Sequence, residues 1–363
     1  MKILEVIEGN GWCGTKEQTY LATRELSKYY DVNLGLAFSH SEMIERLENK
    51  VGLRFYEKGK GSKRRLQIGN YIRLYKIIKK GNYDVVIPNS SFSFNYIVFI
   101  YPFLAKKPKI IAMRRSSHIP SFISKNLKYR LADRIVVVSR KVFEALKSHN
   151  FFPERLVVIE SGVELSRFKP CDEGKYEIRR EFGIKDNEKV FINIANWPKA
   201  QDVLLKAFKD IDCKDCKLIL VGHKTDSDEV KSLINDLGMK DRVLALGFRD
   251  DVEKLLSAAN YFVLSSNLEG IGGALLQAMA SGKVVLSTLA GGISEYLRDA
   301  ENGFSVPCKD VEGMAKKMKK MLSLSGEEYK NLSLKARETA QKYSIENTIQ
   351  KWRELIEELG IRD

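Results

Sequence analysis

The stretch that decides the fold is SSNLEGIGGALLQAMASGKVV, residues 265–285. It reads as the end of a strand, a turn that carries Glu269 and the glycines within residues 270–273, a helix, and a second strand from Lys283. The turn leads to a helix start, where unpaired backbone N–H groups and a partial charge of about +0.5 are available. Such a helix end suits a diphosphate. The order of these pieces therefore predicts a site for a phosphorylated ligand.

Short apolar runs alternate with helical patterns along the chain. The runs cover residues 3–7, 32–38, 84–88, 109–113, 134–138 and 155–159, and then 189–195, 217–221, 242–246, 261–264 and 283–286. The helical patterns cover residues 16–28, 66–80, 142–147, 203–209, 229–237, 252–258 and 347–359. Such alternation predicts parallel sheets buried on both faces, and two series of runs predict two doubly wound halves. The polar stretch 167–174, with Pro170, marks the break.

The opening stretch resembles the donor-binding signature of the family 4, or group 1, glycosyltransferases. Nearly the whole chain follows the family pattern in order, with further matches at 134–139, at VIESGVE (158–164), at LGFRDDV (246–252), at AGGISE (290–295) and at NGF (302–304). The resemblance implies an α/β GT-B fold, in which two Rossmann-like, doubly wound domains face each other across a cleft. Because family members usually return their last helix to the first domain, the expected domains are residues 1–165 with 345–363 on the acceptor side, and 166–344 on the nucleotide-sugar side.

The resemblance also implies an activity. It predicts a metal-independent, hexosyltransferase-like enzyme that retains anomeric configuration and moves a sugar from a UDP- or GDP-linked donor. The acceptor would be a lipid-linked or other glycan of the cell envelope, as in polysaccharide or lipopolysaccharide biosynthesis. The donor is a substrate, so no cofactor and no metal site are expected. The transition state is oxocarbenium-like and the leaving group is a nucleoside diphosphate, so stabilisation of the diphosphate is electrostatic catalysis.

The resemblance assigns the site residues. Glu269 would orient the sugar hydroxyls, and His118, directly after a strand, would contact the donor sugar; the alternative for His118 is a solvated surface loop. The donor-binding residues would be Gly14, Thr15, Lys199, Gly270, Ile271, Gly272, Gly273 and Gln277. Gln277 stands where the family usually has a second Glu, and it can still hydrogen-bond a ribose without charge.

Asn196 stands where the family usually has an Arg that holds the diphosphate together with a Lys, here Lys199. Loss of that Arg removes a charge-assisted contact worth about 1.5–3 kcal/mol. We therefore expect other groups to compensate. The candidate phosphate or acceptor contacts are Lys16, Arg114, Arg115 and Asn196.

The net charge of +14 is confined to the first part of the chain. Residues 1–165 have 29 Lys and Arg against 15 Asp and Glu (29 − 15 = +14), and the rest has 32 of each. The densest segment, residues 58–65, runs into the helical pattern 66–80. This asymmetry favours an anionic or lipid-linked acceptor and an anionic membrane surface as partner, whereas the helix alone could be an ordinary solvated helix. No nucleic-acid-binding motif is evident, so nucleic acid is not expected.

Five scattered cysteines favour reduced thiols, and Met1 leads straight into a strand without a signal segment, so we expect a cytoplasmic protein, peripheral on the cytoplasmic face of the membrane. Cys213 and Cys216 form a lone Cys-x-x-Cys, which is weak support for a metal or redox site. Asp226 and Asp228 resemble a metal-binding pair but lie in a polar loop, which favours a solvated loop.

Three departures from the family pattern, at Cys13, Asn196 and Gln277, leave a second hypothesis open. The chain could be a non-catalytic GT-B partner or scaffold subunit of a glycan-assembly complex. The presence of Glu269 with its glycine turn, and of Lys199, argues against this alternative.

Overall fold

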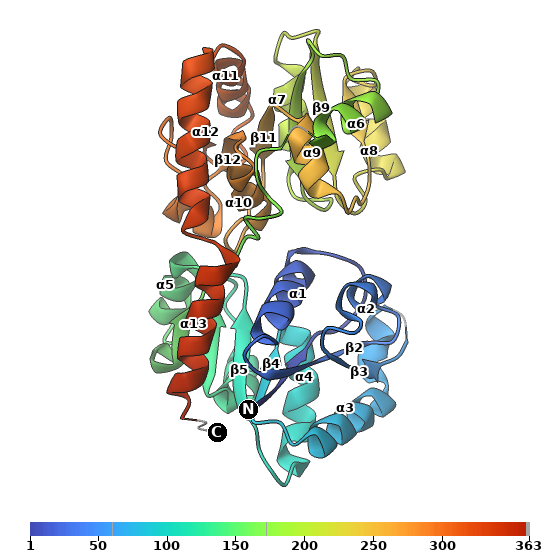
Figure 1. Cartoon of the computed structure of the whole chain (residues 1–363), viewed down its shortest axis with the longest axis vertical. Coiled ribbons are helices and arrows are strands. Elements are labelled where there is room, and N and C mark those ends of the chain that lie inside the picture. The colour runs from blue at the N-terminus through green and yellow to red at the C-terminus, as the bar shows by residue number, and fades with distance from the viewer. Residues whose placement is uncertain (60, 172, 361–363) are drawn as a thin grey trace. The chain divides into compact units, whose positions relative to one another are not determined.

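Two parallel sheets form the frame of the protein (Figure 1). The structure is a computed structural model that describes residues 1–59, 61–171 and 173–360. It divides into two units, Met1–Gly162 with Ile345–Asp363, and Val163–Ser344. The first boundary follows residue 162, whereas the sequence analysis placed it after residue 165. The two doubly wound α/β units confirm the expected fold class.

The first unit has a seven-stranded sheet in the order β3-β2-β1-β4-β5-β6-β7, with every neighbouring pair parallel. Its strands are β1 (Lys2–Val6), β2 (Asp31–Ala37), β3 (Gly52–Glu57), β4 (Val85–Pro88), β5 (Lys109–Arg114), β6 (Arg134–Val137) and β7 (Leu156–Val158). Its helices are α1 (Gly14–Leu26), α2 (Ser41–Leu47), α3 (Ile68–Gly81), α4 (Ser91–Ile100), α5 (Arg140–Ser148) and α13 (Ile345–Glu358). Short helical turns are η1 (Ser62–Leu66), η2 (Tyr101–Phe103), η3 (Ser124–Lys128), η4 (Tyr129–Leu131) and η5 (Pro153–Arg155).

The second unit has a six-stranded parallel sheet in the order β10-β9-β8-β11-β12-β13. Its strands are β8 (Lys189–Ile194), β9 (Cys216–Val221), β10 (Val243–Ala245), β11 (Tyr261–Leu264), β12 (Val284–Thr288) and β13 (Phe304–Val306). Its helices are α6 (Glu173–Glu181), α7 (Gln201–Lys209), α8 (Asp228–Asp236), α9 (Val252–Ala258), α10 (Gly273–Ala280), α11 (Val311–Leu322) and α12 (Gly326–Gln341), with a short turn η6 (Gly291–Glu295).

The strand orders fix where ligands can bind. In the first sheet the chain reverses its direction of growth between β1 and β4, and in the second sheet between β8 and β11. Open α/β sheets bind ligands at the carboxyl ends of the strands beside such a reversal. The loops after these four strands are therefore the places to look for a site in each unit.

The last described helix, α13, completes the first unit. Ile345, Ile349 and Trp352 of this helix are buried in one cluster with Ile3 of β1 and Ile159. Within the described residues, no helix is both long and apolar enough to cross a membrane.

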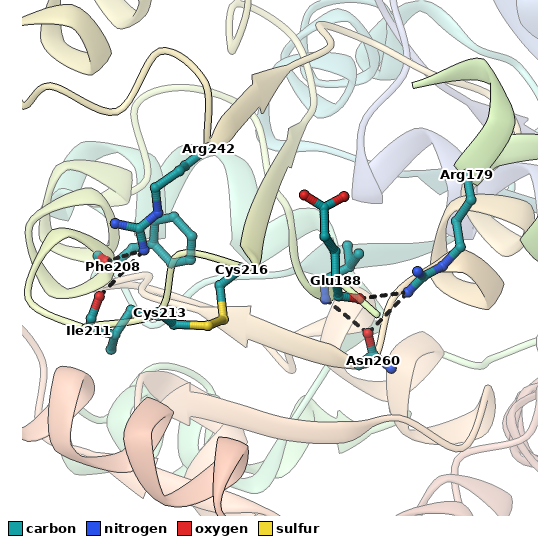
Figure 2. The surroundings of a disulfide bond; sticks show 9 residues. Arg179, Glu188, Phe208, Ile211, Cys213, Cys216, Arg242 and Asn260 are labelled. Carbon is teal, nitrogen blue, oxygen red and sulfur yellow. Dashed lines mark hydrogen bonds between the residues drawn. A yellow bond between two sulfur atoms is a disulfide. The ribbon is translucent and has the colours of Figure 1, made fainter. Parts of the chain in front are cut away.

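The expectation of reduced thiols is wrong for one pair. Cys213 and Cys216 form a disulfide, with their Cα atoms 5.4 Å apart, in the turn between α7 and β9 (Figure 2). This Cα distance is in the usual range for a disulfide. The N–H of Cys213 bonds back to the carbonyl of Ile211 at 3.0 Å. The guanidinium of Arg242 lies 4.6 Å from the ring of Phe208 beside this turn. The other cysteines, Cys13, Cys171 and Cys308, are free and exposed.

Candidate functional site

The carboxyl edge of the second sheet brings two of the expected residues together. The Nζ atom of Lys199, in the loop after β8, lies 2.7 Å from Oε1 of Glu269, in the loop after β11. The Glu269 side chain is 13% exposed and that of Lys199 is 43% exposed. A cation and a carboxylate thus meet at the reversal of the strand order, where both remain in reach of a ligand.

The glycine turn after Glu269 is held by the loop after β12. Gly272 has a positive φ of 76°, and a Cβ there would lie 2.7 Å from Cγ1 of Ile293. A Cβ on Gly291 would overlap the carbonyl oxygen of Glu269, and Gly292 donates its N–H to the carbonyl of Gly270 at 3.0 Å. Only glycine permits this close approach, so the turn and the start of α10 keep one conformation.

The start of α10 is open. No side chain caps the helix at Gly272, so its first N–H groups are available to an anion. Nothing within 4 Å would meet a Cβ placed on Gly273. Ile271 is buried beneath the turn, and the hydroxyl of Tyr296 donates to its carbonyl at 2.8 Å. The first turn of α10 is therefore held in place on its buried side, and its backbone N–H groups are accessible on the other side.

Gln277 lies one helical turn further along α10 and is half-buried. Its carbonyl accepts a hydrogen bond from the hydroxyl of Ser281 at 2.9 Å. Its side-chain amide has no hydrogen-bond partner among the described residues, so it is available to a ligand hydroxyl.

Asn196 has a structural partner. Its Oδ1 accepts the backbone N–H of His223 at 2.9 Å, and the N–H of Trp197 donates to the carbonyl of His223 at 2.9 Å. These bonds join the loops after β8 and β9. Only the side-chain N–H groups of Asn196 therefore remain available to a ligand. They do not replace the charge of an Arg.

Sequence reasoning missed an aromatic pair at this edge. The ring of His223 stacks on that of Phe248, with centroids 4.6 Å apart and planes within 8°. The Nε2 atom of His223 is buried without a hydrogen-bond partner in the described part of the chain. His223 follows Gly222 and Phe248 follows Gly247, and each glycine comes at the end of a strand. This placement is the sequence signal that could have indicated the pair.

In the first unit, the loop after β1 leads into α1. Gly14 begins α1, and a Cβ on it would meet nothing within 4 Å, so it borders open space. Thr15 is the second residue of the helix and its carbonyl accepts the hydroxyl of Thr19 at 2.9 Å. The N–H of Gly9, earlier in this loop, donates to the buried carboxylate of Glu57 at 2.6 Å. The loop is thus held by Glu57 at Gly9 and is accessible at Gly14.

Buried basic side chains gather at the carboxyl edge of the first sheet. Lys16, Arg114 and Lys128 are 6%, 8% and 5% exposed. Lys16 donates to the carbonyl of Glu8, and Lys128 donates to Oγ of Ser91 at 2.6 Å. These hydrogen-bond partners are neutral, and the carboxylate of Glu8 is an opposing charge for both lysines.

Their pKa values reflect this environment. Burial, followed by the charge of Arg114, lowers the pKa of Lys128 to about 8. Burial also lowers the pKa of Lys16, against the opposing charge of Glu8. Burial raises the carboxyl pKa of Glu5 to about 7, although the amide of Asn89 donates to it at 2.7 Å. Glu5 is therefore only about half ionised near pH 7.

Arg115 and His118 follow β5. Arg115 donates to Oδ1 of Asn89 at 3.3 Å, while its Nε is buried and unpartnered among the described residues. Burial lowers the pKa of Arg115 to about 10. His118 is exposed, and its carbonyl accepts a hydrogen bond from Arg114. The structure thus groups Lys16, Arg114 and Arg115 in the first unit with His118 at their rim, and Lys199, Glu269, the glycine turn and Gln277 in the second.

Known proteins resemble the chain in sequence and in fold. Residues 28–167 match the model of Glycosyltransferase Family 4, and residues 174–339 match that of Glycosyl transferases group 1. The N-acetyl-alpha-D-glucosaminyl L-malate synthase of Bacillus anthracis is 34% identical over 166 residues, 45% of this chain and 43% of that protein. The lipopolysaccharide core biosynthesis glycosyltransferase LpsE of Rhizobium meliloti is 36% identical over 106 residues, 29% and 31% of the respective chains. The matched segments thus span less than half the length of either relative.

The crystal structure of Anabaena Alr3699/HepE in complex with UDP and glucose superposes with a TM-score of 0.86, at 21% identity, over 99% of this chain and 100% of that one. This likeness confirms the GT-B fold. The two family models match successive parts of the chain and together cover most of it, so the chain belongs to the group 1, family 4 glycosyltransferases.

Proposed function

We propose that this glycosyltransferase moves a hexose from a nucleoside diphosphate sugar to an anionic acceptor of the cell envelope, with retention of configuration and without a metal ion. The observation that carries the proposal is the 2.7 Å contact between Lys199 and Glu269 beside the open start of α10. Cation, helix N-terminus and carboxylate are the groups that a diphosphate and a sugar need side by side.

The proposed roles follow from charge. Lys199 and the first N–H groups of α10 stabilise the negative charge that develops on the leaving diphosphate. Glu269 accepts hydrogen bonds from the sugar hydroxyls and fixes the reacting geometry. Gln277 bonds the ribose, and the stacked pair of His223 and Phe248 borders the base. The structure of HepE with UDP and glucose supports a uridine donor.

The buried cations of the first unit support an anionic acceptor. Lys and Arg are seldom fully buried unless they are paired. Here Lys16, Arg114 and Lys128 are buried and donate to neutral oxygens, with the carboxylate of Glu8 as a shared opposing charge for the two lysines. A phosphate or carboxylate on the acceptor would supply the missing charge. L-malate, named in one relative, carries such groups, and the other relative acts in lipopolysaccharide core biosynthesis. His118 at the rim of this cluster is proposed to contact the donor sugar.

Titration calorimetry with UDP, GDP and ADP tests the donor site. We expect one nucleotide to bind and, at 100 times its dissociation constant, to raise the free energy of unfolding by about 2.7 kcal/mol. Transfer assays with the matching nucleotide sugar, and NMR of the product's anomeric proton, then test retention. If no nucleotide binds, the proposal fails. If a nucleotide binds but no acceptor is glycosylated, the non-catalytic alternative gains support.

A further inference from the structure

Positive charge is concentrated in one part of the first unit. Residues 58–132 contain 17 Lys and Arg and a single acidic residue, Asp84, giving 17 − 1 = +16. This exceeds the net charge of +14 of the whole chain. The segment covers η1, α3, α4, η2 and η3, so the excess belongs to a defined group of elements.

The same elements, and the two residues just before η3, expose large apolar side chains. Six of them are between 67% and 82% exposed, and we call them the apolar surface: Leu66, Ile68, Phe103, Phe122, Ile123 and Leu127. In the described part of the second unit, no large apolar side chain is more exposed than Tyr176, at 65%. Scattered apolar residues are normal on a protein surface, but six within one run of strongly basic chain are not.

The elements that carry the apolar surface adjoin one another. The guanidinium of Arg65, in η1, lies 3.3 Å from the ring centroid of Phe92 in α4. Tyr71 of α3 meets Phe99 of α4 edge to face at 5.6 Å (Figure 1 shows both helices). Lys128 of η3 bonds Asn95 of α4 at 2.9 Å. η2 follows α4 directly in the chain. The apolar side chains therefore lie on a continuous set of packed elements.

Basic side chains on these elements, in the loop after η2 and in η4 remain available. Lys63, Lys76, Lys107 and Arg130 are exposed, and none has an ion pair with a carboxylate within the described residues. Arg64 differs, because it is mostly buried, with its Nε 3.4 Å from Oε2 of Glu57, the carboxylate that accepts the N–H of Gly9. Lys60 lies outside the described residues.

We propose that the apolar surface and these four basic residues bind the surface of an anionic lipid bilayer, with the apolar side chains inserted among the headgroups. The positive charge of residues 58–132 favours an anionic surface as the binding partner. Interfacial binding combines apolar insertion with attraction of Lys and Arg to anionic lipids. A second copy of the chain would bring two segments of charge +16 together, which repulsion opposes. The proposal rests on the proposed function, because it makes the anionic acceptor a lipid-linked one. Membrane binding itself does not require catalysis.

Co-sedimentation with vesicles tests the proposal. We expect the protein to bind vesicles of phosphatidylglycerol and phosphatidylcholine, and not phosphatidylcholine alone. The variant F122S/I123S/L127S should bind at least about tenfold more weakly. The variant K63Q/K107Q/R130Q should lose up to about fivefold for each charge near the lipid. The control Y176S/L334S, in exposed positions of the second unit, should bind like the wild type.

Three results would overturn the proposal. The wild type could stay in the supernatant, which would show that it does not bind an anionic bilayer. F122S/I123S/L127S could bind unchanged, which would reduce the interaction to adsorption by charge. The wild type could self-associate and F122S/I123S/L127S be monomeric, which would assign the apolar surface to a second copy. UDP affinity, measured on every variant, reports the donor site and folding separately, so failure of membrane binding and failure of the proposed donor activity are distinguishable.

Discussion

Removal of the Lys199 charge provides a sharp test of the donor site. Lys199→Gln keeps a polar side chain of similar length but removes the ammonium group that lies 2.7 Å from Glu269. If Lys199 serves to bind a diphosphate, the substitution should weaken ligand binding strongly and change folding stability little. A purely structural ion pair would give the opposite pattern.

The two magnitudes can be worked out from the structure. Two unit charges 2.7 Å apart in water attract by about 1.5 kcal/mol, and the entropy of fixing long side chains reduces this, so exposed pairs contribute about 0.2–1 kcal/mol to stability. The Lys199 side chain is 43% exposed, so the smaller range applies. A charge-assisted hydrogen bond to the diphosphate is worth about 1.5–3 kcal/mol, which corresponds to about 10- to 150-fold in affinity.

Calorimetric titration with UDP and urea unfolding measure the two quantities. Lys206→Gln is the matched control, because Lys206 also pairs with a carboxylate, Asp202 at 3.5 Å, within α7 of the same unit. We expect Lys199→Gln to bind UDP at least tenfold more weakly and to unfold within about 1 kcal/mol of the wild type. Unchanged UDP affinity, or an equal loss in Lys206→Gln, would refute the reasoning.

Three other predictions concern catalysis, pH and the disulfide. Glu269→Ala should lower sugar transfer on the order of 100-fold while UDP still binds, and Gln277→Glu should keep activity; normal transfer by Glu269→Ala would remove Glu269 from the site. Because the carboxyl pKa of Glu5 rises from 4.5 to about 7 in the folded protein, folding stability should fall by about 3 kcal/mol as the pH rises through this interval. Glu5→Gln should flatten that part of the pH profile of urea unfolding, and a profile like the wild type's would contradict the pKa. The disulfide closes a loop with a sequence separation of only 3, so Cys213→Ser with Cys216→Ser should cost about 2 kcal/mol in urea unfolding, and no cost would argue against a formed bond.

The buried strands were the elements that the sequence predicted best. β11 is a continuous apolar run, and β1 is buried at every position after Lys2, because parallel strands in the sheet interior are covered on both faces. β3 was missed because it is an edge strand whose first four residues, including Arg54, stay at least partly accessible. The short elements β13, with three residues, and α2, with seven, were missed too.

The donor side of the site was predictable where it is local in sequence. Glu269, the glycine turn and the start of α10 follow one another, so their order alone indicated a phosphate site. The stacking of His223 on Phe248 and the burial of Lys128 beside Arg114 depend on which strands become neighbours. The order of the strands within a sheet cannot be read from the sequence alone. The disulfide was missed for a similar reason, since a Cys-x-x-Cys spacing does not determine the shape of the turn between the two cysteines.

The return of α13 to the first unit also constrains the order of events during protein synthesis. The core around Ile3 and Ile159 needs Ile345, Ile349 and Trp352, which the ribosome adds only after the second unit. That unit spans 344 − 162 = 182 residues, so at about 5–20 residues per second the first sheet waits roughly 10–40 s for its last helix. The second unit is continuous in sequence and can complete its core before the first, although it is translated later. During this interval the apolar side chains that α13 will cover, among them Ile3 and Ile159, lack their final packing partners.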